Sequence, residues 1–169
     1  MRSRSFPLTD MPWLLMLVLV AIGLPRTVLA DLDIVAPESS LLYYVLALAP
    51  FAAWLAVAVL RPTRRPVPDF LVLGVLYGLS LVLAHQLLWH APGAEHSIPQ
   101  GAIDFARGFA PAGQELALRG YTAVVSLGIG IGTGLVAAVA AVIARTVRNA
   151  RHRHLTRVTV PATSAEGEH

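Results

Sequence analysis

Cysteine is absent from this chain of 169 residues, and so is lysine. Without cysteine the chain forms no disulfide, no thiolate metal site, no iron–sulfur cluster and no cysteine nucleophile. The thirteen basic residues are all arginine. Together with abundant Ala, Gly, Pro, Val and Leu, this composition indicates a bacterium with a GC-rich genome, which concerns the organism and leaves the function open.

Charged residues are also scarce. Only 14% of the chain is charged whereas 56% is hydrophobic, and the mean hydropathy is +0.64. Soluble globular proteins carry about 25% charged residues. The composition therefore predicts an integral membrane protein, in which lipid covers most of the apolar surface.

Four stretches poor in charge are long enough to cross a bilayer, for which a helix needs about 20 apolar residues. They cover residues 11–30, 40–60, 70–90 and 120–145. Pro25 and Arg26 interrupt the first, and Pro50 is expected to bend the second. We predict an all-α bundle of four transmembrane helices that forms a single membrane domain over residues 1–148. Residues 149–169 are predicted to be a basic cytosolic tail that is disordered at its end.

The first stretch has a second interpretation. Two arginines, an apolar run, Pro25 and then Val28-Leu29-Ala30 resemble a cleavable secretory signal. Cleavage there would leave three spans, so the sequence leaves open whether residues 1–30 remain as a helix.

The arginines predict the orientation, because short cytoplasmic flanks are enriched in arginine and lysine. The connections expected outside instead carry most of the acidic residues, namely Asp31, Asp33, Glu38, Glu95, Asp104 and Glu115. This pattern predicts a multi-pass protein of the bacterial inner membrane with both termini in the cytosol. The arginines on the predicted cytosolic side are Arg2, Arg4, Arg61, Arg64, Arg65, Arg145, Arg148, Arg151, Arg153 and Arg157.

The exterior connection between spans three and four is too long for a simple turn. Its apolar residues share one helical face and its polar residues another, which predicts a short amphipathic helix. This helix either rests on the outer leaflet or caps the bundle. The apolar face contains Ala102, Phe105, Ala106 and Phe109, and the polar face contains Gln100, Asp104 and Arg107.

A run of four alternating glycines, from Gly128 to Gly134, superficially suggests a nucleotide-binding loop. The third glycine of a dinucleotide fingerprint is missing in both possible registers, and there is no P-loop lysine. Small residues in a span instead allow helix backbones to approach closely. We predict that spans three and four are neighbours, with Gly78 near Gly132 or Gly134. The predicted packing residues are Gly74, Gly78, Ser126, Gly128, Gly130, Gly132, Gly134 and Ala138.

His85 is the only histidine inside a predicted span, and an ionisable residue there is a functional hypothesis by default. Arg26, Gln86 and Glu115 are expected near the same outer level, so the four side chains are a candidate polar cluster. The structural alternatives are a hydrogen bond from His85 to a residue such as Ser126 and an arginine that extends to the interface.

Other chemistry finds little support. The acidic residues lie outside the four apolar cores, and neither a GxSxG elbow nor an HExxH zinc pattern is present. A haem held between helices normally takes ligands from two of them, whereas only one span contains a histidine. We therefore predict no catalytic residues, no metal and no cofactor, and an enzymatic role is uncertain and not favoured.

The basic stretch after the fourth span predicts binding to anionic lipid head groups at Arg145, Arg148, Arg151 and Arg153. No aromatic residues alternate with these arginines to stack on bases, so nucleic acid is not expected as a partner. The other expected partners are a second copy of the chain or a larger membrane protein.

Three functional hypotheses follow. The first is a small non-catalytic accessory or scaffold protein that packs through its small-residue stripes. The second is an outward-facing ligand-binding or enzymatic pocket around Arg26, His85 and Glu115. The third is an oligomeric pore or facilitator.

Overall fold

The structure is a computed structural model that describes residues 9–32, 34, 41–91 and 98–158. Within these residues the chain folds into five helices and no strand. The helices are α1 (Trp13–Asp31), α2 (Leu41–Leu60), α3 (Pro66–Leu87), α5 (Gln100–Ala106) and α6 (Pro111–Val158). The predicted all-helical class is confirmed.

Three of the helices are long and apolar enough to cross a membrane, namely α1, α3 and the part of α6 over Pro111–Arg151. Helix α2 contributes a shorter apolar stretch, Tyr44–Leu60. Such runs favour helices because in lipid every backbone polar group must be satisfied within the chain.

Prolines lie inside two of these helices without ending them. Helix α1 continues past Pro25 to Asp31, and α2 continues past Pro50. Pro25 and Arg26 thus interrupt the apolar run of the first predicted span but not the helix. A proline lacks the N–H that would bond to the carbonyl four residues earlier, and the rest of each helix still satisfies its own backbone groups.

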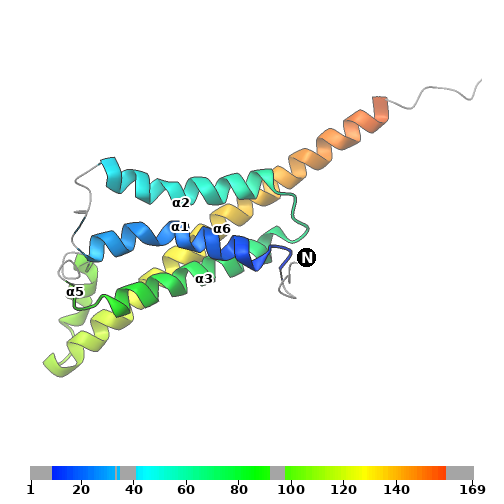
Figure 1. Ribbon diagram of the computed structural model, residues 1–169. Coiled ribbons are helices and arrows are strands. Elements are labelled where there is room, and N and C mark those ends of the chain that lie inside the picture. The colour runs from blue at the N-terminus through cyan, green and yellow to red at the C-terminus, as the bar shows by residue number, and fades with distance from the viewer. Residues whose placement is uncertain (1–8, 33, 35–40, 92–97, 159–169) are drawn as a thin grey trace, which may run out of the picture.

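Helix α6 is a single helix of 48 residues, about 72 Å long at 1.5 Å per residue. It begins at Pro111, a residue suited to the first helical position because its missing N–H has no partner there. It is much longer than the span predicted over 120–145, and it continues through residues 149–158 of the predicted tail. Figure 1 shows α6 running diagonally across the other helices and extending past them. Residues 161–169, where disorder was predicted, lie outside the described residues.

The most extensive helix contact joins α3 and α6, as expected from the sequence. Helix α1 contacts α2 and α3, and α2 also contacts α6 (Figure 1). We name the two ends of the bundle by a buried carboxylate at each. The Asp69 end holds the starts of α1 and α3 and the end of α2, and the Asp31 end holds the ends of α1 and α3.

The buried apolar core lies toward the Asp69 end. Its members come from the residue Met11 before α1, the first half of α1, the last turns of α2, the first turns of α3 and the later part of α6. They are Met11, Met16, Leu19, Val20, Trp54, Ala58, Phe70, Leu73, Ala137, Ala138 and Ala141. The two ends are therefore packed differently.

The α3–α6 crossing depends on glycine. A Cβ added to Gly74 would lie 2.5 Å from the Gly130 carbonyl oxygen, and one added to Gly130 would lie 2.6 Å from the Gly78 Cα. Gly78 also faces the backbone of Ser126 and Leu127. The sequence predicted that Gly78 lies near Gly132 or Gly134, whereas it lies nearest Gly130, up to about one helical turn away. The position at which two helices cross depends on both helices together.

The short helix predicted in the connection between the third and fourth spans is α5. It buries Ala102 and Ala106 against α6, while Phe105 and Phe109 remain 50% and 47% exposed. The Phe105 ring lies 5.7 Å from that of Tyr121 on α6. The predicted apolar face is therefore only partly covered, with its alanines inward.

Candidate functional site

The Asp31 end holds an ion pair that joins two helices. Asp31 is the last residue of α1, and its side chain is only 2% exposed. His85 lies in the last turn of α3 and is 26% exposed, and its Nδ1 is 3.0 Å from Asp31 Oδ2. Because α1 and α3 end at the same level, the two side chains meet directly.

Asp31 is poorly satisfied apart from this contact. Among the described residues, no hydrogen-bond donor reaches either of its carboxylate oxygens in good geometry. The approach of His85 is thus an ion-pair contact by distance and not a well-directed hydrogen bond. A buried carboxylate is unfavourable without donors, and this one also lies at a helix C-terminus, where the helix dipole disfavours negative charge.

A second polar contact joins the same two helices nearer the middle of the bundle. The Tyr77 hydroxyl donates to the Gly23 carbonyl oxygen at 3.4 Å, and a Cβ on Gly23 would overlap the Tyr77 ring. Arg26 has an exposed side chain within electrostatic range of the Tyr77 hydroxyl. Gln86 is half-buried beside His85 in the last turn of α3.

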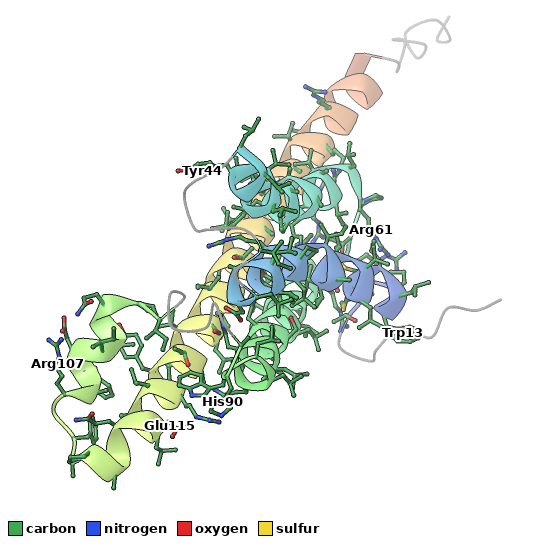
Figure 2. The ribbon with its side chains drawn as sticks, turned by 60° about the vertical axis from the view of Figure 1, so that its left-hand side comes forward. Trp13, Tyr44, Arg61, His90, Arg107 and Glu115 are labelled. Atoms are coloured by element: carbon green, nitrogen blue, oxygen red, sulfur yellow. The ribbon has the colours of Figure 1, made fainter. Side chains whose placement is uncertain are left out.

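Glu115 makes a different contact from the one considered in the candidate cluster. Its Oε1 accepts from Arg119 at 2.7 and 3.1 Å, one turn further along α6. The Arg119 guanidinium in turn lies 4.9 Å from the centre of the Trp89 ring. Figure 2 shows Glu115, His90 and Arg107 at this end, and Trp13 and Arg61 at the other. His85 thus has Asp31 as its carboxylate partner, while Glu115 is paired within α6.

The Asp69 end contains a second buried carboxylate in a different setting. Asp69 lies in the first turn of α3 and is fully buried. One oxygen accepts from the Asp10 backbone N–H at 2.7 Å and the other from the Thr63 hydroxyl. Its place in the first helical turn is favourable for negative charge. This carboxylate therefore ties together the chain before α1, the α2–α3 connection and α3.

Arginines at the Asp69 end donate to backbone carbonyls. Arg61 binds the Asp10 oxygen at 3.1 Å and Arg145 binds the Arg64 oxygen at 3.0 Å. Arg148 donates to the oxygen of Val59, in the last turn of α2. The carbonyls in the last turn of a helix lack helical partners, so the cation of Arg148 at the C-terminal end of α2 is stabilising.

The small residues of α6 fall on two faces. Gly130, Gly134, Ser126 and Ala138 are buried, and a Cβ on Gly134 would overlap the Phe70 carbonyl of α3. Gly128 and Gly132 are exposed, and an added Cβ would meet nothing within 4 Å. The six predicted packing residues of α6 thus separate into a covered face and an open face, while Gly74 and Gly78 lie on α3.

The arrangement limits the chemistry of the site. Across the described ranges, no group of three or more His, Asp or Glu side chains could hold a metal ion. One carboxylate and one imidazole in contact can exchange a proton or bind a polar ligand. Comparisons with protein-family models, with curated proteins and with solved structures gave no match.

The Asp31–His85 pair was missed by sequence reasoning although both residues had been considered. Asp31 was assigned to the exterior connection because the first span was predicted to end at residue 30. Two facts could have indicated the pair. Asp31 and His85 lie at the same ends of their helices, and a histidine inside a span needs a polar partner.

Proposed function

We propose that the chain is a small protein of the bacterial inner membrane with four spans, formed by α1, α2, α3 and the middle of α6. The Asp69 end faces the cytosol in this proposal, with both termini on that side. The arginines support it, since Arg61, Arg64, Arg65, Arg145 and Arg148 gather at that end.

The proposed role is that of a non-catalytic accessory or scaffold protein that associates with a second copy or a larger membrane protein. One observation carries this proposal. Helix α6 has two glycine faces, of which α3 covers one, while Gly128 and Gly132 are open. Small residues four apart allow a second helix to approach closely in a bilayer. Val124 and Val136, which are 71% and 55% exposed, continue this open face at the same spacing.

Photo-cross-linking in native membranes tests this role. A benzoylphenylalanine at Val136 should form a protein adduct, which mass spectrometry identifies as a second copy or another membrane protein. The substitution Gly132→Leu should reduce that adduct severalfold. A matched probe at Val18 on α1, which is 48% exposed, should yield lipid adducts only. Lipid adducts alone at Val136 would remove the basis for the proposal.

Part of the basic segment of α6 is also proposed to bind anionic lipid head groups. Arg145 and Arg148 already contact backbone carbonyls, whereas Arg151 is exposed one turn further along. Arg153 lies in the segment whose side chains are outside the description. We assign the principal lipid contact to Arg151 and Arg153, since a basic residue near an anionic leaflet contributes about 1 kcal/mol.

A second candidate function is a site for a small ligand at the Asp31 end. The buried and poorly satisfied carboxylate of Asp31 favours it.

A further inference from the structure

The two buried carboxylates of the bundle differ in what surrounds them. Asp69 accepts from a backbone N–H and a hydroxyl, while neither oxygen of Asp31 has a well-directed donor among the described residues. Asp31 has His85 at 3.0 Å and is itself 1% exposed. A buried anion with so little compensation is costly, and an ionisable group at such a position points to function.

We propose that Asp31 and His85 together form a proton-binding site at the Asp31 end of the bundle. With neutral imidazole and ionised carboxylate, the pair carries one buried negative charge. One proton from water makes the pair neutral overall, either as imidazolium with carboxylate or as neutral imidazole with carboxylic acid. The proton belongs to the pair, as is usual for strongly coupled groups. No other bond is made or broken.

His85 is the more exposed member of the pair, since its side chain is 26% exposed whereas that of Asp31 is 2% exposed. The imidazole is therefore the group through which the proton enters. Histidine suits this role because its charge ordinarily changes between about pH 5 and 8.

Other charges on the neighbouring helices act on the same equilibrium. On α1, Arg26 is the only basic residue. Both members of the pair lie at the C-terminal ends of their helices, where the partial charge is negative. On α6, Glu115 and Arg119 are paired with each other and so largely cancel. Beyond α3, His90 is the next group that can change its charge. Tyr77 on α3 and Tyr121 on α6 are the phenols facing this half of the bundle.

The site links proton binding to the contact between α1 and α3. When the pair has bound the proton, an ion pair or a hydrogen bond between carboxylic acid and imidazole holds the end of α1 against α3. When the proton leaves, the buried negative charge is stabilised by separation and hydration. The proposal therefore predicts that the contact is closed at low pH and opens at high pH. This inference does not depend on the open glycine face of α6.

The absence of native cysteine makes the test direct. Cysteines replace Leu32 and Leu87, which are 37% and 75% exposed at the ends of α1 and α3, and carry spin labels. Distances are measured by double electron–electron resonance in lipid nanodiscs at about pH 5 and about pH 8. The distribution should be narrow at the lower pH and move to longer distances at the higher pH.

Three controls accompany the measurement. Labels at Leu14 and Val67, at the Asp69 end, should show no change with pH. Asp31→Asn should abolish the shift, because an amide carries no charge in either condition. His85→Gln should do so as well, and it keeps the test decisive if Asp31→Asn fails to fold.

Specific results would overturn the inference. These are a distribution independent of pH in the otherwise unchanged chain, a shift that survives both substitutions, and a shift that follows sodium concentration at constant pH. Loss of the cross-link from Val136 with the pH shift intact would instead count against the proposed scaffold role alone.

Discussion

Each end of the bundle holds one buried carboxylate, yet the two ends stabilise it differently. At the Asp69 end, two donors satisfy the carboxylate, arginines bind backbone carbonyls including one in the last turn of α2, and the apolar core packs alongside. At the Asp31 end, the carboxylate has His85 and no well-directed donor within the described part of the chain.

This contrast separates the polar groups that stabilise the fold from those that can respond to pH. A carboxylate at a helix N-terminus that accepts from two donors is compensated by the fold itself. A carboxylate at a helix C-terminus that faces a histidine depends on a proton for its compensation. We therefore expect substitutions at the Asp69 end to change stability most, and substitutions at the Asp31 end to change the response to pH.

The largest effect is expected for Asp69→Ala. It leaves the Asp10 N–H and the Thr63 hydroxyl without their acceptor at a buried position, and the free energy of unfolding should fall by about 3 kcal/mol. Unfolding by SDS titration in bicelles measures this change. Asp69→Asn keeps one acceptor oxygen and should cost about 1 kcal/mol. If Asp69→Ala lowers the free energy of unfolding by less than about 1 kcal/mol, water must reach both donors. The two ends would then differ less in how they stabilise their carboxylates.

Gly130→Ala tests the crossing that lies between the two ends. The new Cβ would overlap the backbone of Gly74 and Gly78, so α3 and α6 must separate, at a cost of about 2 kcal/mol. The matched control is Gly128→Ala, whose Cβ meets nothing within 4 Å and whose stability should be unchanged or slightly raised. The same titration compares them. Equal effects of the two substitutions would argue against the observed register.

Arg148→Ala should have a smaller effect at the Asp69 end. It removes the donor to the Val59 carbonyl at the end of α2 and should lower stability by about 1 kcal/mol. Arg151→Ala is the control, since this exposed residue lies one turn further along α6 and should change stability very little. If both variants lose the same stability, Arg148 contributes through its charge alone and not through its hydrogen bond to the end of α2.

The smallest effect is expected for Glu115→Gln at the Asp31 end. Its ion pair with Arg119 is exposed, and such pairs contribute at most about 0.5 kcal/mol. Thermal unfolding at low and high salt should barely separate the variant from the parent. A loss above about 1 kcal/mol would mean that ion pairs stabilise this end more than its exposure indicates.

Much of the fold could be predicted because it depends on local sequence. The apolar runs predicted helices close to the observed α2 and α3, and the amphipathic pattern predicted α5. The predicted first span, 11–30, is also close to α1, although Pro25 and Arg26 interrupt its apolar run. The length of α6 was underestimated, because a change from apolar to basic residues marks the end of an apolar span and not the end of a helix.

The candidate site was less predictable. The sequence indicated His85, but the structure gives it Asp31 as its carboxylate, while Glu115 binds Arg119. Both carboxylates were expected near the same end, so residue type and depth did not separate them. Which carboxylate contacts His85 depends on the rotation of each helix about its own axis and on where α1 ends.

By itself, the sequence determined the all-helical class, the approximate position of the long apolar helices and the close approach of α3 and α6. These features follow from run length and from the spacing of small residues, both of which are local. Only the tertiary structure decided which glycines of α6 are covered, which donors satisfy Asp69 and which residue faces His85. Those contacts join residues far apart in the chain, and their geometry depends on helix rotation and register, which the packing of all the helices sets together.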